Sequence, residues 1–284
     1  MKFVSPSFSS IFLLLAVLSP ALPAQQSGDE ETSRGAFLIT RTKPAGGSAG
    51  TKAPPAGNHN KPPVTGKPAK TPAPVPAVGL GYTLYQKDAD GNPVRVEASR
   101  EFHAGDAVRL MIEANTDGFL YVFHTENGNN PQMIFPDARL NGGDNHIRAH
   151  VPYEVPSRQE TDPRFRWFYF DQNAATERLY LVVTREPLPG VPSGGALVTH
   201  CRNTPKDCPW RPESALWGQL ASNVGTASRL SRNRDAGQRQ TETESEAVNR
   251  GLGLPPDAPA PSVVGMNTSG GAKRLVMTID LVHK

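Results

Sequence analysis

The strongest constraint on the fold comes from residues 102–136, where three apolar runs are separated by turn-forming residues. The first run, residues 107–113, alternates between apolar and other side chains, a pattern typical of a strand with one buried face. The second run, residues 119–124, is apolar on both faces, as in a central strand. The third run, residues 132–135, ends at a proline. The stretch therefore predicts three consecutive strands of one β-rich body.

Similar strand-like runs recur at short intervals, with turn residues between them. They cover residues 82–87, 93–97, 165–170, 178–184 and 274–283. An Asp-Gly step between the first two runs is a hairpin signal. The last run alternates through four apolar residues, so we expect it to return to the body and pair with one of its strands. This spacing of strands predicts a mainly β protein, a sandwich rather than a βαβ fold.

The first residues are typical of a secretory signal peptide. Lys2 precedes an apolar run at residues 11–18, and small residues follow up to Ala24. The run is too short to span about 30 Å of hydrocarbon as a permanent helix. We therefore predict that residues 1–24 are a signal peptide, cleaved after Ala24. The mature protein would be periplasmic or secreted, without a transmembrane anchor; the alternative is an uncleaved membrane anchor.

Residues 25–79 separate this signal from the folded body. We interpret residues 25–42 as a polar leader with a possible edge strand at residues 35–41, which read GAFLITR. Residues 43–79 form a linker rich in proline, glycine and lysine, and its few large apolar residues predict disorder. The net charge of the chain is only +3, and its basic surplus lies in this region. The linker is either a solvated spacer or a salt-sensitive contact for anionic lipid or polymer.

We divide the rest of the chain into a β-sandwich core at residues 80–190 and a C-terminal extension at residues 191–284. The extension contains a cysteine loop, two short predicted helices and the closing strand. The first helix, residues 212–220, begins with a proline. The second, residues 242–250, has a capping box starting at Thr241 and a glycine stop.

Cys201 and Cys208 are the two cysteines of the chain. In an exported protein, an even pair this close together predicts a local disulfide. A zinc site is the alternative, but it would need two more ligands, and among nearby residues only His200 is adjacent.

A set of motif residues in the central region resembles the bacterial domain-of-unknown-function family numbered 4384. These residues are Phe102, Gly105, Asp106, Val108, Leu110, Gly118, Tyr121, Val122, Phe135, Pro136, Glu177, Leu179 and Val182. The resemblance covers roughly residues 94–188, with Phe119 as a mild departure from the family pattern. It implies an immunoglobulin-like β-sandwich, often in exported or envelope-associated bacterial proteins and sometimes fused to protease or kinase domains. It implies no established activity and no catalytic residues.

The same motif residues have direct structural interpretations. We expect Gly105 and Asp106 to turn the chain into a strand, with the carboxylate bonded to nearby backbone. Gly118 permits a positive φ angle at the turn into the second run. Phe135 is predicted to fill the core, and Pro136 to end a strand because it has no N–H to donate.

Residues that carry chemistry do not form a recognisable constellation. The metalloprotease, phosphate-loop and dinucleotide motifs are absent from the sequence. Asp88, Asp90 and Asn92 resemble the start of a calcium loop, but the twelfth position is Ser99 rather than an acid, so we interpret the segment as a turn. The histidines show no ligand spacing. We therefore predict no metal, no cofactor and no nucleic-acid partner.

The aromatic run at residues 165–170 is the candidate binding surface. If it is a strand, Phe165, Trp167 and Tyr169 share one face. Exposed, they would stack on a sugar or on an apolar anchor of a partner. The alternative is a central strand in which the same residues are buried.

Together these patterns predict a non-catalytic exported domain that binds an envelope protein or a cell-wall polymer. The alternative is an exported hydrolase whose active site is assembled from scattered His, Asp and Ser residues. The sequence indicates no oligomeric state.

Overall fold

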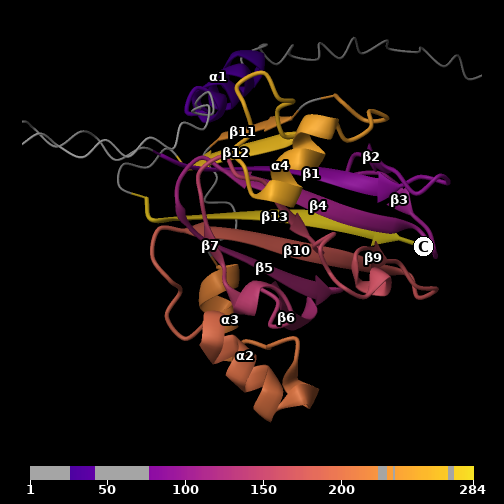
Figure 1. The fold of residues 1–284 in the computed structure, drawn as a ribbon, viewed down its shortest axis with the longest axis vertical. Coiled ribbons are helices and arrows are strands. Elements are labelled where there is room, and N and C mark those ends of the chain that lie inside the picture. The colour runs from indigo at the N-terminus through magenta and orange to yellow at the C-terminus, as the bar shows by residue number, and fades with distance from the viewer. Residues whose placement is uncertain (1–25, 42–76, 223–228, 233, 268–271) are drawn as a thin grey trace, which may run out of the picture.

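Figure 1 shows the chain as a computed structural model that describes residues 26–41, 77–222, 229–232, 234–267 and 272–284. Within these ranges two β-sheets pack face to face, and helices lie on the outer side of each. The prediction of a mainly β fold is confirmed. The predicted signal peptide, residues 1–24, and the predicted linker as far as residue 76 lie outside the described residues.

The first sheet combines strands from both ends of the described chain. Its order is β11 (Arg229–Arg232), β12 (Val263–Asn267), β1 (Val78–Lys87), β4 (Ala107–Ala114) and β8 (Tyr153–Val155), with β2 (Pro93–Arg95) paired to β1 and β9 (Phe168–Tyr169) paired to β4. All of these pairs are antiparallel. The predicted hairpin is confirmed, because β1 and β2 pair across a turn in which Oδ1 of Asp88 accepts hydrogen bonds from the N–H groups of Asp90 and Asn92.

The second sheet has the predicted closing strand in its interior. Its order is β3 (Glu101–Phe102), β13 (Arg274–His283), β10 (Ala175–Thr184), β5 (Gly118–Glu126) and β6 (Asn129–Phe135), with β7 (His146–Ile147) paired to β5. The expectation that the last run pairs with a strand of the body is confirmed, since β13 pairs with β10 over the whole length of both strands.

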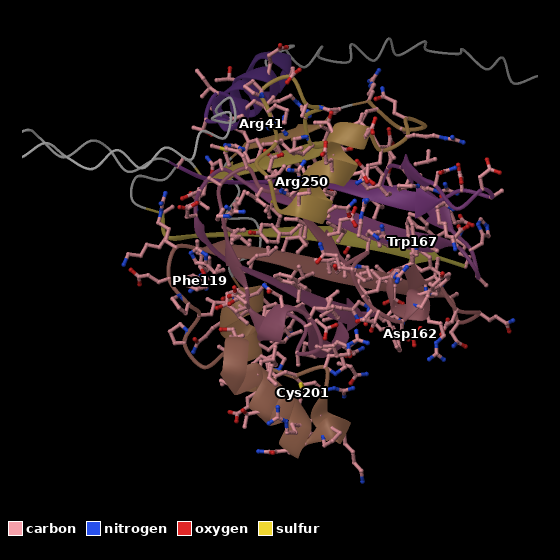
Figure 2. The ribbon with its side chains drawn as sticks, in the orientation of Figure 1. Arg41, Phe119, Asp162, Trp167, Cys201 and Arg250 are labelled. Carbon is pink, nitrogen blue, oxygen red and sulfur yellow. A yellow bond between two sulfur atoms is a disulfide. The ribbon has the colours of Figure 1, made fainter. Side chains whose placement is uncertain are left out.

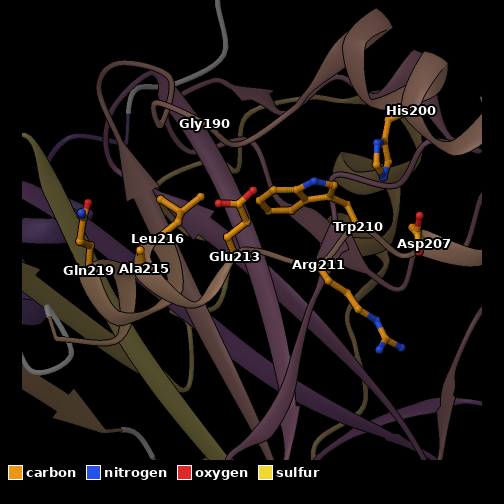
Figure 3. A pocket seen from close by; sticks show the side chains of 9 residues that line it. All are labelled: Gly190, His200, Asp207, Trp210, Arg211, Glu213, Ala215, Leu216 and Gln219. Carbon is orange, nitrogen blue, oxygen red and sulfur yellow. The ribbon is translucent and has the colours of Figure 1, made fainter. Parts of the chain in front are cut away.

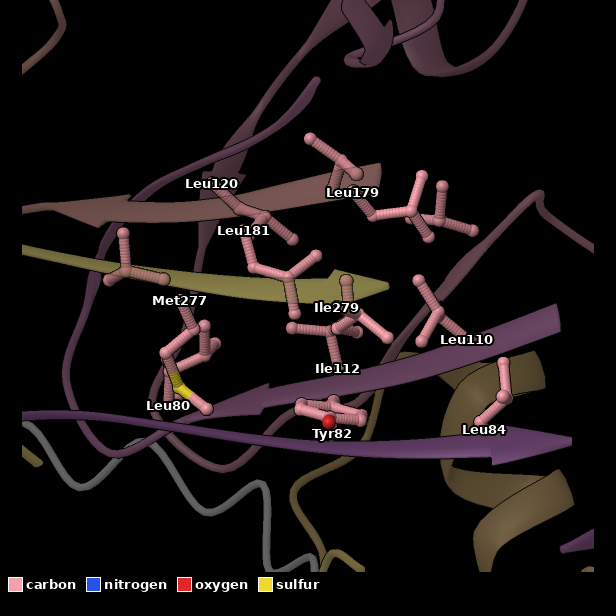
Figure 4. Packing of buried hydrophobic residues seen from close by; sticks show 14 of the residues in the cluster. Leu80, Tyr82, Leu84, Leu110, Ile112, Leu120, Leu179, Leu181, Met277 and Ile279 are labelled. Carbon is pink, nitrogen blue, oxygen red and sulfur yellow. The ribbon is translucent and has the colours of Figure 1, made fainter. Parts of the chain in front are cut away.

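The main core lies between the two sheets, where alternate side chains of facing strands meet (Figure 4). The labelled side chains are Leu80, Tyr82, Leu84, Leu110 and Ile112 from the first sheet, and Leu120, Leu179, Leu181, Met277 and Ile279 from the second. Each of them is buried. The period-two alternation of these strands therefore corresponds to one buried inner face for each sheet.

Two helices cover the outer face of the second sheet, at the bottom of Figure 1. They are α2 (Gly194–Asn203) and α3 (Ser214–Ala221). Leu197 and Leu220 from these helices pack on Tyr121, Phe123 and Val276 of the sheet in a second apolar cluster. The ring of Trp217 contacts the rings of Phe123 and Tyr180, which fixes α3 to the strands beneath it.

The outer face of the first sheet is covered by α4 (Glu242–Arg250) and by α1 (Gln26–Leu38). The bounds of α4 are those predicted. Thr241 and Glu244 form the reciprocal capping box, and Gly251 ends the helix with a φ of 59°. Three short 3₁₀ turns complete the described structure: Asn141–Gly143, Pro163–Phe165 and Pro205–Asp207.

The edge strand predicted at residues 35–41 is wrong, because these residues belong to α1 and the turn that follows it. Ser33 and Phe37 are buried, and their spacing of four places them on one face of α1, while Arg41 is buried just beyond the turn that ends the helix. Ile39 between them is 83 % exposed. A short apolar run fits a strand or a helix face, and here contact with the first sheet selects the helix.

The predicted division at residue 190 does not separate two structural units. β12 and β13, both from the predicted extension, lie beside β1 and β10 inside the two sheets. The body also begins earlier than predicted, since β1 starts at Val78. The closing strand was assigned to an extension because its partner β10 is distant in the sequence, and β12 was not predicted as a strand.

Candidate functional site

A cavity of about 680 Å³ lies on the outer side of the second sheet, next to the loop closed by Cys201 and Cys208. Its walls come from α2, the cysteine loop, α3 and the turn after β10. The lining residues are Gly190, His200, Asp207, Trp210, Arg211, Glu213, Ala215, Leu216 and Gln219 (Figure 3). The predicted disulfide is present, with an S–S distance of 2.00 Å. It joins the end of α2 to the segment that carries Trp210.

Trp210 occupies the middle of this cavity in Figure 3, between Glu213 on one side and His200 and Asp207 on the other. Its backbone carbonyl accepts a hydrogen bond from the N–H of Met133 at 2.8 Å, which anchors it to β6. One part of the ring packs on the apolar cluster beneath α3, and the side chain is half-buried. Within the described residues its indole N–H has no hydrogen-bond partner. Trp210 thus offers an apolar face and a donor to a ligand.

The charged side chains around Trp210 are not committed to ion pairs. Considering the described part of the chain, Asp207, Arg211 and Glu213 have no side-chain hydrogen bond or salt bridge, and all three are exposed. His200 is held only by a long contact of 3.4 Å from its Nε2 to the hydroxyl of Thr204. The cavity therefore presents one cation, two anions and an imidazole beside a tryptophan, and each of these groups is available to a polar ligand.

A wider hollow of about 930 Å³ near the β1–β2 hairpin has a different character. Nε2 of Gln86 donates to Asp106 at 2.8 Å, and Arg100 donates to the oxygen of the same Gln86 side chain. Asp88 accepts hydrogen bonds from its own turn, which hold its pKa below the usual value. The polar groups of this hollow thus bond mainly to one another, so we regard the Trp210 cavity as the candidate site.

The three aromatic residues predicted to form a binding surface do not share a face. Trp167 is buried, whereas Phe165 and Tyr169 are 46 % and 50 % exposed. The run is not a continuous strand, because Phe165 ends a 3₁₀ turn and β9 has only two residues. The prediction of an exposed face is therefore wrong for Trp167. The alternative of a buried central strand is also wrong, because Phe165 and Tyr169 are exposed and β9 is short.

Trp167 instead stabilises a buried arginine on the outer face of the first sheet. The guanidinium of Arg109 lies 4.0 Å from the centre of the Trp167 ring and donates to the carbonyl oxygen of Arg166. It also pairs with Glu154 at 3.2 Å. Burial lowers the pKa of Arg109, and the pair with Glu154 opposes this effect. Arg109, Glu154 and Trp167 are all buried in this arrangement. Phe165, for its part, is overlaid by Arg139 and Arg164.

A cluster that the sequence did not reveal lies at one end of the second sheet. Glu177 of β10 bonds to His124 of β5 through Oε2, and to His283 of β13 through Oε1 at 3.2 Å. These hydrogen bonds outweigh the effect of burial and lower the pKa of Glu177. Nε2 of Gln132 lies 3.0 Å from Nδ1 of His124, so neutral His124 carries its proton on Nε2 and donates it to Glu177.

This cluster has little capacity for chemistry. Both oxygens of Glu177 and both ring nitrogens of His124 are engaged. Nδ1 of His283 has no partner within the described residues, but it is buried against Phe170. Within those residues no group of three or more His, Cys, Asp or Glu side chains is arranged to hold a metal ion. The three residues therefore act as a cross-link between neighbouring strands.

The family-motif residues lie mainly in the sandwich. Phe102 is buried and stacks on Phe170, and Tyr121 accepts a hydrogen bond from the N–H of Leu188. Gly105 has a φ of 89° and precedes Asp106, whose Oδ2 accepts from the N–H of His103, as predicted. Phe135 is partly buried against the main core, and Pro136 is buried directly after β6.

Gly118 does not use the positive φ that a glycine permits. Its role is close approach: an added Cβ would lie 2.2 Å from the carbonyl oxygen of Thr184. A glycine that permits close contact of two strands cannot be distinguished in the sequence from a glycine in a turn.

Comparison with known families bears on this central region. Residues 101–187 match the model of a domain of unknown function, DUF4384. The match confirms the resemblance in the sequence and spans about a third of the chain. The DUF4384 segment runs from β3 to just after β10, so β1, β12 and β13 complete its sheets from outside the match. All the lining residues of the Trp210 cavity also lie outside it. Searches among curated proteins and among solved structures each found no match.

None of the helices in the described ranges is both long and apolar enough to cross a membrane.

Proposed function

We propose that this chain is a non-catalytic, exported binding module of the bacterial envelope that contacts cell-wall glycan through the cavity around Trp210. The observation that supports the proposal best is that the charged side chains of Asp207, Arg211 and Glu213 in this cavity are unpaired in the described structure. A half-buried tryptophan with a free indole N–H is surrounded by charged side chains without partners in the described structure. Elsewhere the charged groups of the buried faces are paired.

The chemistry of the cavity suits a sugar polymer that carries charged substituents. The face of a tryptophan ring packs against the C–H face of a pyranose, and the indole N–H donates to a ring or hydroxyl oxygen. Arg211 can pair with a carboxylate, while Asp207 and Glu213 can accept hydrogen bonds from hydroxyl, amide or ammonium groups. A cell-wall glycan with peptide or amino substituents offers each of these groups.

Export is part of the same proposal. It rests on the predicted signal peptide at residues 1–24 and agrees with the disulfide, since disulfides persist in oxidising compartments. Intact-mass analysis of chain recovered from a periplasmic extract or culture medium should give a protein that begins at Gln25. Recovery of the chain with its leader, from cytosol alone, would contradict this part.

The absence of catalysis is likewise proposed. The alternative, an exported hydrolase, would find its best constellation in His124, Glu177 and His283. Because the nitrogens of His124 and the oxygens of Glu177 already bond within the cluster, a general base would first have to break one of these bonds. A panel of glycan and peptide substrates should show no turnover. Turnover lost in Glu177→Gln with the fold intact would favour the hydrolase.

The binding proposal is tested by co-sedimentation of the mature chain with purified cell-wall sacculi. We expect the wild-type chain to sediment with the sacculi in a saturable manner, and Trp210→Ala to lose at least tenfold in affinity. Arg211→Ala and Glu213→Ala should weaken binding without affecting folding, because both side chains are exposed and unpaired in the described structure.

Tyr169→Ala is the matched control, since Tyr169 is an exposed aromatic residue of the surface predicted from the sequence. It should bind like the wild type. Loss of binding in Tyr169→Ala and not in Trp210→Ala would move the site to that surface. If the wild-type chain does not sediment with the sacculi, the glycan proposal is wrong.

A further inference from the structure

The N-terminal helix packs on the outer face of the first sheet, on the side of the molecule away from the Trp210 cavity, and we call the surface that it covers the groove. Figure 2 shows Arg41 at this side and Cys201, which borders the cavity loop, at the opposite end. α1 contacts β11 and β12. Ser33 and Phe37 of α1, together with Arg41 three residues beyond its end, form a buried stripe. No covalent bond within the described residues joins α1 to the body. The groove is therefore a helix-binding site whose present occupant belongs to the same chain.

Two glycines of β1 lie beneath Phe37, the aromatic residue of this stripe. Phe37 is fully buried against Val264 and Met266. An added Cβ at Gly79 would lie 2.9 Å from the Phe37 ring, and one at Gly81 would lie 3.4 Å from it. Glycine at both outward positions leaves a depression in the sheet, which Phe37 fills together with Met266 beside Gly79 and Pro261 beside Gly81.

An ion pair fixes the end of the helix. Nε and Nη2 of Arg41 donate to the two oxygens of Glu113 at 2.8 and 2.6 Å. Nη1 of Arg41 donates to the carbonyl oxygen of Ala258 at 2.8 Å. Both partners of the ion pair are buried, so the site specifies arginine by charge and by bidentate geometry.

His150 completes the recognition of this end. Its Nδ1 lies 2.7 Å from Oε1 of Glu113, and its Nε2 lies 2.7 Å from the hydroxyl of Thr40. The edge of its ring contacts Phe37. His150 holds a φ of 59°, which is uncommon for a residue other than glycine. The body thus presents a formed pocket with an apolar floor and an acidic end.

The connector to α1 is much longer than docking on its own body requires. Ala77, which follows the connector, packs against the same apolar cluster as Phe37. Between Arg41 and Ala77 lie 35 residues, residues 42–76. A chain of this length can span at most about 115 Å. The helix can therefore reach the groove of a neighbouring molecule as well as its own.

We propose that this groove is a recognition site for the Ser33–Phe37–Arg41 stripe and that it also binds α1 of a second copy of the chain. The contacts are the same whether α1 binds its own body or that of a second copy, so the protein concentration alone determines which of the two forms. A connector of this length gives the cis helix an effective concentration on the order of millimolar. Dilute protein is then monomeric, and crowded protein exchanges helices.

The test uses the full mature chain with Phe37→Ala and Arg41→Ala, which empties the groove, and a fluorescent peptide of residues 26–41 as the probe. We expect the peptide to bind this variant, and to bind the wild type about a hundredfold more weakly because the cis helix competes. A peptide with both substitutions should not bind. A peptide with Ile39→Ala should bind normally, since Ile39 faces solvent.

Failure of the peptide to bind a variant with native circular dichroism would overturn the proposal, and so would equal binding to variant and wild type. If the variant does not fold, a protease site inserted within residues 42–76 of the wild-type chain replaces it. After cleavage, labelled peptide should exchange with the bound segment; no exchange overturns the proposal. Light scattering of the wild type and of Ile39→Ala should show dimers towards millimolar concentration. A variant that carries Phe37→Ala and Arg41→Ala should stay monomeric. A wild type that is monomeric throughout would exclude binding of a second copy.

Discussion

The guanidinium of Arg95 is joined to the carboxylate of Glu244, and both side chains are sealed from solvent. Arg95 belongs to β2, and Glu244 lies in the first turn of α4, 149 residues further along the chain. Glu244 also accepts hydrogen bonds from the hydroxyl of Tyr85 at 3.1 Å and from the N–H of Thr241 at 2.9 Å. One carboxylate thus caps its own helix and fixes that helix to the first sheet.

We expect Glu244→Gln to lower the free energy of unfolding by about 2 kcal/mol, because it removes one of the two carboxylates, Glu244 and Asp235, that pair with the buried cation Arg95. Urea unfolding followed by fluorescence measures the change. The matched control is Glu246→Gln on the same helix, whose pair with Arg250 is exposed and should contribute less than about 1 kcal/mol. Equal losses in the two variants would contradict this interpretation.

Gly118 provides a second prediction for stability. We expect Gly118→Ala to lower the free energy of unfolding by more than about 2 kcal/mol, since the new Cβ would overlap the carbonyl oxygen of Thr184. Gly195→Ala in α2 is the control, because nothing lies within 4 Å of its added Cβ. It should leave stability unchanged or raise it by up to about 1 kcal/mol. A harmless Gly118→Ala would mean that β5 and β10 are further apart than described.

Acid should weaken the cross-link around Glu177. Hydrogen bonds from His124 and His283 lower the pKa of Glu177 in the folded state. A lowered pKa contributes stability above the unfolded value, near 4.5, and this contribution is lost as the pH falls through the folded pKa. The difference in unfolding free energy between wild type and Glu177→Gln should therefore shrink between pH 5 and about pH 3. A difference that stays constant would contradict the role of this carboxylate.

Alkali should act on the core through Tyr82. Burial raises the pKa of Tyr82 to about 12 in the folded state. A raised pKa contributes stability below the unfolded value of 10.0, and this contribution is lost as the pH rises through the folded value of about 12. Tyr82→Phe should consequently lose less stability than wild type between pH 10 and about pH 12. Thermal unfolding at a series of pH values measures the stability of both proteins. The same dependence on pH in wild type and Tyr82→Phe would count against burial of this hydroxyl.

Local patterns in the sequence predicted the elements that depend on neighbouring residues. The alternation of β13, the capping box from Thr241 to Glu244 and the turn at Asp88 each follow from side chains within a few positions of one another. Cys201 and Cys208 belong to this group as well. These features needed no knowledge of the tertiary fold.

Features that depend on distant contacts were missed. The run at residues 35–41 was interpreted as a strand because the depression at Gly79 and Gly81, which favours a helix with Phe37 inward, is formed 40 residues later. The four-residue spacing of Ser33, Phe37 and Arg41 was the one local signal for this helix. Trp167 was assigned to a binding surface because its partner, Arg109, is not adjacent in the sequence.

The candidate site was missed for a similar reason. Trp210 follows the cysteine loop in the sequence, and part of its ring packs against the apolar cluster beneath α3. Its position in a cavity depends on how the cysteine loop and the turn at Gly190 come together. The His124, Glu177 and His283 cluster likewise joins three strands whose order in the sheet no local pattern reveals.

The central claim, a glycan site at Trp210, is tested most directly by fluorescence titration with soluble cell-wall glycan fragments. The account predicts a saturable change in tryptophan emission for the wild type and for Tyr169→Ala, and none for Trp210→Phe, in which Trp167 and Trp217 remain as internal references. The same change in Trp210→Phe, or no change in the wild type at millimolar glycan, would contradict it.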